Sequence, residues 1–214
     1  MAKVLLLTAH PQLEHSRVNL ALMTAARQVP DGTVAVRDLY ALYPDYLIDV
    51  AAEQAALAEA QLVVWQHPLH WYGMPPLLKL WLDEVFAFGW AYGPGGNALR
   101  GKDLWLVVST GGSAEAYHPS GHNRHFIDAF WPPCEQTAAL AGMRFLPPLV
   151  LHGAHQVSDA EVAAHAALFV ARLQQYPDWP ELDELPVCPG CEVPMADRPP
   201  ELLAQQAMLS GGQP

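Results

Sequence analysis

Short apolar runs alternate along the chain with longer segments in which apolar residues recur with helical period. The short runs predict five strands, at residues 4–9, 33–39, 62–66, 104–109 and 144–151. The longer segments predict helices at residues 17–28, 48–60, 76–88, 125–141 and 160–175. A strand-helix order repeated in this way is typical of an α/β protein with a parallel sheet.

The character of the strands indicates how the sheet is covered. Most of them are hydrophobic almost throughout, as expected for parallel strands with helices on both faces. Crossover connections are right-handed, so five such units form an open doubly wound sheet. We therefore predict a flavodoxin-like, doubly wound, five-stranded parallel sheet with helices on both faces. In that topology ligands bind beyond the carboxyl ends of the strands, so we expect the site in the loops after the first, third and fourth strands.

The texture of the sequence changes after Tyr176. Pro177-Asp178-Trp179-Pro180 follows, then further prolines and acidic residues up to Pro214. With about 150 residues per domain as a guide, the 214 residues predict one domain at 1–176 and a Pro-rich C-terminal tail at 177–214.

Charge and cysteine content exclude several classes of function. The net charge is −11, from 22 acidic and 11 basic residues, which opposes binding to a nucleic acid backbone. No run approaches the roughly 20 apolar residues of a membrane span, and the first residues lead directly into a strand without a signal-peptide pattern. Three cysteines, at 134, 188 and 191, make a disulfide framework improbable. These features predict a cytoplasmic protein.

The first of the three loops, residues 8–19, predicts an anion site. It feeds a helix through Ser16 and brings Arg17 and Asn19 to the helix N-terminus, where backbone N–H groups lack helical partners. The loop is not glycine-rich, so it matches neither the dinucleotide fingerprint nor the Walker A pattern. The alternative is structural: Ser16 caps the helix and His10 packs at the end of the strand.

The second loop, residues 67–76, predicts a wall for a flat ring system. Trp71 and Tyr72 stand there together with Gly73 and the prolines at 75 and 76. The alternative is that both aromatic residues belong to the core or to a dimer interface.

The third loop, residues 109–122, predicts close backbone approach to a ligand. Gly111 and Gly112 allow amides to reach the ligand, while Tyr117 and nearby histidines offer protons.

Two histidine and cysteine patterns invite a metal hypothesis. His118, His122 and His125 are closely spaced, but no HExxH motif accompanies them. Cys188 and Cys191 form one CxxC pair, which is insufficient alone, although two such tails in a dimer would complete a four-cysteine zinc site. We predict no metal at the functional site.

Longer blocks of the sequence resemble a known family. The blocks are residues 9–11, 16–19 and 39–45, a long stretch from Trp65 to Gly93, then Ser109-Thr110-Gly111-Gly112 and Leu146-Pro147-Pro148. In these blocks the chain resembles the NAD(P)H:quinone oxidoreductase family of flavodoxin-like proteins. Within that family it most resembles the ancillary flavoproteins of glutathione-regulated potassium efflux systems. The resemblance covers residues 3–176.

The resemblance implies a set of cofactor-binding residues. Around the FMN phosphate and ribityl chain it places His10, Ser16, Arg17, Val18 and Asn19. Along the isoalloxazine ring it places Pro68, Leu69, His70 and Trp71, and at the polar edge of the ring Ser109, Thr110, Gly111, Gly112 and Tyr117.

The resemblance also implies catalytic residues, a tyrosine and a histidine that manage the charge of the reduced flavin. Tyr117 falls at the tyrosine position. Counting from Tyr117 without gaps places Asn123 at the histidine position, with His122 one residue earlier, and His122 is taken as the candidate.

The implied function is two-electron, ping-pong hydride transfer from NAD(P)H through FMN to a quinone-like acceptor, in a homodimer with its site at the subunit interface. FMN is preferred to FAD because no further adenine-binding segment follows. One alternative is a regulatory subunit that activates a potassium efflux antiporter, peripheral at the inner face of the membrane through that partner. Another is a flavodoxin-type electron carrier, which the negative charge would suit.

Overall fold

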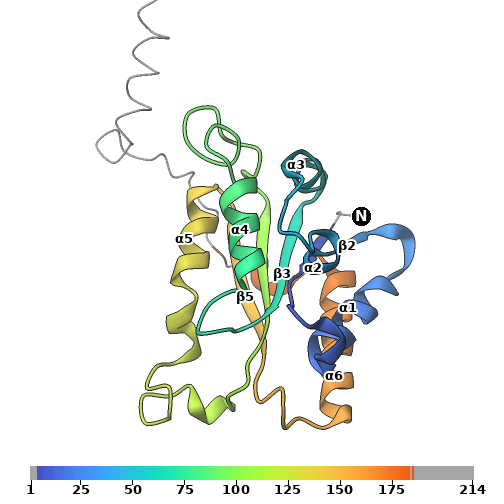
Figure 1. Ribbon diagram of the computed structural model, residues 1–214, viewed down its shortest axis with the longest axis vertical. Helices are drawn as coiled ribbons and strands as arrows, with labels where there is room; N and C mark the ends of the chain where they lie inside the picture. The colour runs from blue at the N-terminus through green and yellow to red at the C-terminus, as the bar shows by residue number, and fades with distance from the viewer. Residues whose placement is uncertain (1–3, 184, 186–214) are drawn as a thin grey trace, which may run out of the picture.

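The computed structural model describes residues 4–183 and 185, and within them a single five-stranded sheet forms the centre of the molecule (Figure 1). The strands are β1 (Val4–Thr8), β2 (Val34–Asp38), β3 (Leu62–Pro68), β4 (Asp103–Ser109) and β5 (Arg144–Leu151). They lie in the order β2-β1-β3-β4-β5, and all neighbours are parallel. The predicted flavodoxin-like doubly wound sheet is therefore confirmed.

Helices cover both faces of this sheet. They are α1 (Arg17–Arg27), α2 (Leu39–Leu42), α3 (Val50–Glu59), α4 (Pro76–Val85), α5 (Pro132–Leu140) and α6 (Asp159–Gln175). Short 3₁₀ turns occur at Leu13–His15, Pro30–Gly32, Ala114–Ala116, Ile127–Phe130 and Pro180–Asp183. One core cluster packs α1 and α6 on one face, and a second packs α2, α3, α4 and α5 on the other (Figure 1).

Alternation along each strand explains the continuous hydrophobic runs. Leu5 and Leu7 of β1 enter one cluster, whereas Val4 and Leu6 enter the other. Because successive side chains point to opposite faces and both faces are covered, every position of such a strand must be apolar.

One predicted helix is wrong at its start. Helix α5 begins at Pro132 instead of residue 125, and the segment before it contains the 3₁₀ turn Ile127–Phe130. Pro132 and Pro133 have no N–H to donate, so they fit the first turn of a helix but would break its interior.

The predicted third strand is also too short. β3 continues through Pro68, which pairs with Ser109 of β4, and the N–H of Leu69 donates to the Ser109 carbonyl at 2.8 Å. Proline is tolerated there because it lies at the end of the ladder.

The packed body extends beyond the predicted boundary at residue 176. Trp179 and Leu182 are buried in the α1/α6 cluster, and the Arg172 guanidinium lies 5.2 Å from the centre of the Trp179 ring. The first residues of the predicted tail are therefore part of the domain. The predicted cysteine pair, Cys188 and Cys191, lies outside the described residues. Among the helices of the described part, none has the length and apolar character needed to cross a bilayer.

Candidate functional site

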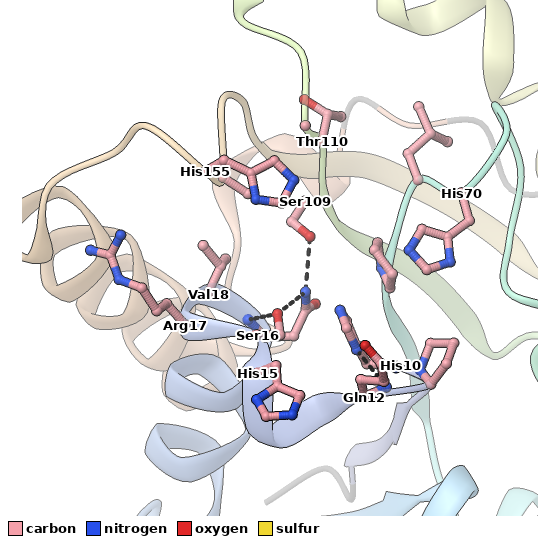
Figure 2. Close-up of a pocket in the computed structure, with 16 residues that line it drawn as sticks. His10, Gln12, His15, Ser16, Arg17, Val18, His70, Ser109, Thr110 and His155 are labelled. Carbon is pink, nitrogen blue, oxygen red and sulfur yellow. Dashed lines mark hydrogen bonds between the residues drawn. The ribbon is translucent and has the colours of Figure 1, made fainter.

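A cavity of about 700 Å³ opens at the carboxyl edge of the sheet, between the loops that follow β1, β3, β4 and β5 (Figure 2). We call it the main pocket. Eleven of the predicted site residues line it: His10, Ser16, Arg17, Val18, Asn19, Pro68, Leu69, His70, Ser109, Thr110 and Gly111. Its volume is within the range of cofactor and small-molecule sites.

A second depression of about 310 Å³, here called the side hollow, adjoins the main pocket. Leu69 and Gly111 line both spaces and so lie between them. The remaining predicted residues line the side hollow: Trp71, Gly112, Tyr117 and His122. The structure thus brings all of the predicted site residues to one place.

Buried polar side chains form the floor of the main pocket. Asn19, 1% exposed, donates from Nδ2 to Ser16 Oγ at 3.0 Å and to Ser109 Oγ at 2.9 Å (Figure 2). Gln66 donates to the Asn19 carbonyl at 2.8 Å and accepts from the Thr8 hydroxyl at 2.9 Å. Because these bonds join β1, β3, β4 and α1, the floor is fixed and fully satisfied.

The N-terminus of α1 opens onto the main pocket. Ser16 caps this helix by accepting from the Asn19 N–H at 3.3 Å, as the structural alternative for Ser16 requires. The N–H groups of Arg17 and Val18 have no hydrogen-bond partner within the described residues, as expected in a first helical turn. They lie at the positive end of the helix dipole, so this end of the pocket favours an anion.

The Arg17 side chain takes a different direction from its amide. Its guanidinium donates to Asp159 Oδ1 at 2.5 Å and to the Val157 carbonyl at 3.2 Å. Figure 2 shows the side chain extending away from His10 and His70. The positive charge of Arg17 is therefore held against the start of α6 rather than in the pocket.

Two histidines stand on the opposite wall. The rings of His10 and His70 meet edge to face, with centroids 5.9 Å apart. Burial lowers the pKa of His10, and the neighbouring His70 lowers it further; burial also lowers the pKa of His70. The Gln12 N–H donates to His10 Nδ1 at 3.1 Å, which assigns the proton of neutral His10 to Nε2.

The loop after β3 forms a tight and strained turn. His70 and Gly73 exchange two backbone hydrogen bonds of 3.0 Å, and the residues between them, Trp71 and Tyr72, have φ of 49° and 64°. Two positive φ angles define a type I′ turn, which usually takes Asn and Gly, and each such angle costs a bulky residue about 1–3 kcal/mol. Trp71 is 95% exposed, so of the alternatives given for it, a place in the core of the single chain is wrong.

Tyr72 packs on one side of the side hollow. Its ring stacks on Phe130 at 5.2 Å between centroids, and its hydroxyl donates to Asn123 Oδ1 at 3.2 Å. Asn123 also lines the side hollow, so Tyr72 and Asn123 together hold the third loop in place.

Tyr117 lies on the other side of the side hollow and is 8% exposed. Burial raises the pKa of Tyr117, and a hydrogen bond with Thr110 opposes that shift. The hydroxyl therefore stays protonated at neutral pH. His122, the other predicted catalytic residue, is exposed and forms no hydrogen bond or ring contact within the part of the chain that the structure describes.

The loop after β5 also belongs to the site, and the sequence did not reveal it. Ala154 and His155 line the main pocket, and His152 lies next to Thr110. The sequence does contain a signal for this loop, because His152-Gly153-Ala154-His155 directly follows a hydrophobic strand, where ligand-binding loops of such sheets occur. Pro11, Gln12 and His15 are three further lining residues that the sequence did not reveal.

The closely spaced histidines do not form a metal cluster. Across residues 4–183 and 185, no three His, Cys, Asp or Glu side chains are arranged to hold a metal ion. His118 Nδ1 instead lies 2.7 Å from Ser120 Oγ, and the His118 ring packs on Phe126.

A family model described as "Flavodoxin-like fold" matches residues 2–175. The chain belongs to this family of flavodoxin-like proteins.

The chain is also similar to several individual proteins. The chain is 48% identical over 170 residues to the glutathione-regulated potassium-efflux system ancillary protein KefF of Citrobacter koseri, a match covering 79% of this chain and 94% of the relative. General stress protein 14 of Treponema denticola, solved in complex with FMN, is 39% identical, with a TM-score of 0.75 over 80% of this chain and 98% of that one. An NADPH-quinone reductase from P. pentosaceus is 28% identical, with a TM-score of 0.70, and the match covers 81% of this chain and 96% of that one.

Proposed function

We propose that the main pocket and side hollow together bind FMN, and that the protein is an NAD(P)H:quinone oxidoreductase. The observation that carries the proposal is a pair of adjoining spaces: the main pocket contains an anion-favouring helix N-terminus, and the side hollow is lined by exposed Trp71 and buried Tyr117. The names of the relatives support it, because they include an FMN complex and a quinone reductase.

The main pocket fits the phosphate and sugar-alcohol part of FMN. The unpaired amides of Arg17 and Val18 offer two donors to a phosphate, and Ser16 Oγ lies beside them. His10 and His70, kept neutral by burial, would contribute hydrogen bonds there without a full charge. The satisfied floor around Asn19 would hold these groups at fixed positions before the ligand arrives.

The side hollow fits the flat ring of FMN. Trp71 projects from a rigid turn, and the N–H groups of Gly111 and Gly112 have no hydrogen-bond partner in the described part of the chain. A Cβ at Gly112 would lie 3.3 Å from the Tyr117 ring, so a larger residue would crowd this wall.

A bound flavin would supply the redox chemistry, accepting hydride from the nicotinamide of NAD(P)H and passing two electrons to a quinone-like acceptor. The chain's own residues would orient the reactants and stabilise the charge that develops in the site. Tyr117 remains a phenol and so donates a hydrogen bond, while the Gly111 and Gly112 amides act as fixed dipoles toward negative charge in the hollow. FMN is preferred to FAD, as the resemblance of the sequence implies.

We propose that the protein is a homodimer, which large apolar side chains exposed in the single chain support. Trp71 at 95% and Leu47 at 75% are large apolar side chains that lie open in the single chain. A second copy placed over Trp71 would bury it and close the side hollow, leaving room for a nicotinamide or quinone.

The KefF relative favours a second function. We infer that the same protein serves as an ancillary subunit of a potassium efflux antiporter, which places it in the cytoplasm at the inner face of the membrane. Co-purification of the full chain with the cytosolic part of that antiporter tests this role, and the enzyme proposal does not depend on the result.

The enzyme proposal is tested by spectroscopy and turnover. Purified full-length protein, reconstituted with FMN, should show a flavin absorbance spectrum that NADPH or NADH bleaches and a quinone restores. Tyr117→Phe keeps the ring and removes the hydroxyl, and it should lower kcat by about tenfold to a hundredfold while FMN remains bound. A protein that takes up no flavin would overturn the proposal.

A further inference from the structure

The loops after β4 and β5 are joined into one unit. The Gly153 N–H donates to the Gly112 carbonyl, and the Ala154 N–H donates to the Thr110 carbonyl, both at 2.8 Å. These bonds fix His152 beside Thr110, which lines the main pocket, while His152 itself lines neither space and acts from behind Thr110.

The Thr110 hydroxyl connects two groups in this unit. Its Oγ1 lies 2.8 Å from the Gly112 carbonyl oxygen and 3.1 Å from His152 Nδ1. A hydroxyl has one proton, and a carbonyl only accepts. Thr110 therefore donates to Gly112, and His152 donates to Thr110 from Nδ1. Nε2 is then the His152 atom that is free to gain or lose a proton.

Tyr117 is the third member of the group. Its ring centroid lies 5.4 Å from that of His152, and the neighbouring Thr110 side chain lowers its pKa. Asn123, by contrast, is engaged by the Tyr72 hydroxyl, and His122 has no such link to Tyr117 in the described residues.

We propose that His152, rather than His122, is the histidine that works with Tyr117 in the side hollow. It is a positioning residue: through Thr110 it orients the Gly112 backbone and the Tyr117 hydroxyl. At Nε2 it takes up one proton from solvent when negative charge develops in the hollow. The inference deepens the proposed function, since FMN reduction would supply that charge.

The surroundings of His152 suit this role. Burial lowers the pKa of His152, and the Glu115 carboxylate raises it. Glu115 is fully exposed, while Tyr117 stays neutral because burial raises its pKa. His152 is thus neutral in the resting site, and added negative charge nearby would favour its protonated form.

The first test needs no flavin. Proton NMR of the cofactor-free full chain should show Thr110 and Tyr117 signals that shift with the titration of the His152 ring. Thr110→Val removes the connecting hydroxyl, so the Tyr117 signals should no longer follow the titration of His152. Tyr117 signals that follow His122, or that ignore His152 in the wild-type protein, would overturn the inference. This result is separate from whether FMN binds.

The second test uses protein loaded with FMN. His152→Asn keeps a donor near the place of Nδ1 but cannot be protonated. It should bind oxidised FMN within about twofold of wild type and reduced FMN about tenfold more weakly, the effect of one pKa unit. The midpoint potential should also lose part of its pH dependence between about pH 5.5 and 8.

Two further histidine variants make this test selective. His165→Asn, on α6 and lining neither space, is the matched control and should behave as wild type. His152→Asn with a wild-type potential and pH dependence would overturn the inference. So would His122→Asn with an effect as large as that expected for His152→Asn.

Discussion

At the amino-terminal edge of β4 and β5, polar side chains satisfy one another, whereas at the carboxyl edge several backbone donors have no partner. Arg144 donates to both Asp103 oxygens at 2.8 Å, Tyr176 donates to Asp103, and Arg144 also reaches the Leu182 carbonyl. Around the pocket, the amides of Arg17 and Val18 lack partners among the described residues.

The backbone differs between the two edges as well. Trp71 and Tyr72 adopt strained positive φ angles beside the pocket, while Tyr176 leads into a segment that packs into the core. The side-chain network at the amino-terminal edge stabilises the fold. The carboxyl edge has unpaired backbone donors and strained backbone angles, where a ligand can bind. Substitutions at the two edges should therefore affect different measurements.

The largest effect is expected from Asp103→Ala at the paired edge. It removes the carboxylate to which the half-buried Arg144 and the Tyr176 hydroxyl donate, and should lower the free energy of unfolding by about 3–5 kcal/mol in urea titrations. Asp83→Ala, which breaks the exposed Lys79–Asp83 pair, should cost less than about 0.5 kcal/mol. An equal cost for both would contradict the stabilising role assigned to Asp103 at the amino-terminal edge.

The next effect concerns His67, which is buried on β3 near the pocket edge. Burial lowers the pKa of His67 from 6.5 to about 4. Between these values the unfolded chain binds a proton that the folded chain refuses, so stability should fall as pH drops from about 6.5 to 4, by roughly 3 kcal/mol. His67→Asn should flatten that part of the stability profile, and an unchanged slope would refute the assignment.

A smaller effect isolates the free amide at the α1 N-terminus. Arg17→Pro removes the N–H, and proline fits the first helical position. Arg17→Ala removes the same side chain and keeps the N–H. The proline variant should bind FMN about tenfold more weakly than the alanine variant, with a similar melting temperature. Equal affinities in fluorescence titrations would show that this amide does not meet the phosphate.

The smallest effect is expected from the strained turn. Trp71→Gly relieves a positive φ at an exposed residue and should raise the free energy of unfolding by about 1 kcal/mol relative to Trp71→Ala. Both variants should lose FMN affinity severalfold, because both lack the ring. A glycine variant less stable than the alanine variant would contradict the inference that the backbone at Trp71 is strained.

The sequence predicted the sheet because both of its faces are buried, which forces continuous apolar runs. It missed the start of α5, where two prolines outweigh a helical pattern, and the burial of Trp179, which depends on Trp105 of β4, a residue far away in the chain. The site loops after β1, β3 and β4 carry local signals such as Gly111-Gly112. His152 acquires its place only through contacts with Thr110, 42 residues away in the chain, and no local pattern reports such a contact.

The central claim is that the carboxyl edge holds FMN with its phosphate at the α1 N-terminus. Equilibrium titration of the cofactor-free full chain with FMN and with riboflavin tests it most directly, because the two differ by the phosphate. FMN should bind at least about tenfold more tightly than riboflavin, and Arg17→Pro should narrow that gap. Equal affinity for the two ligands, or binding of neither, would contradict the account.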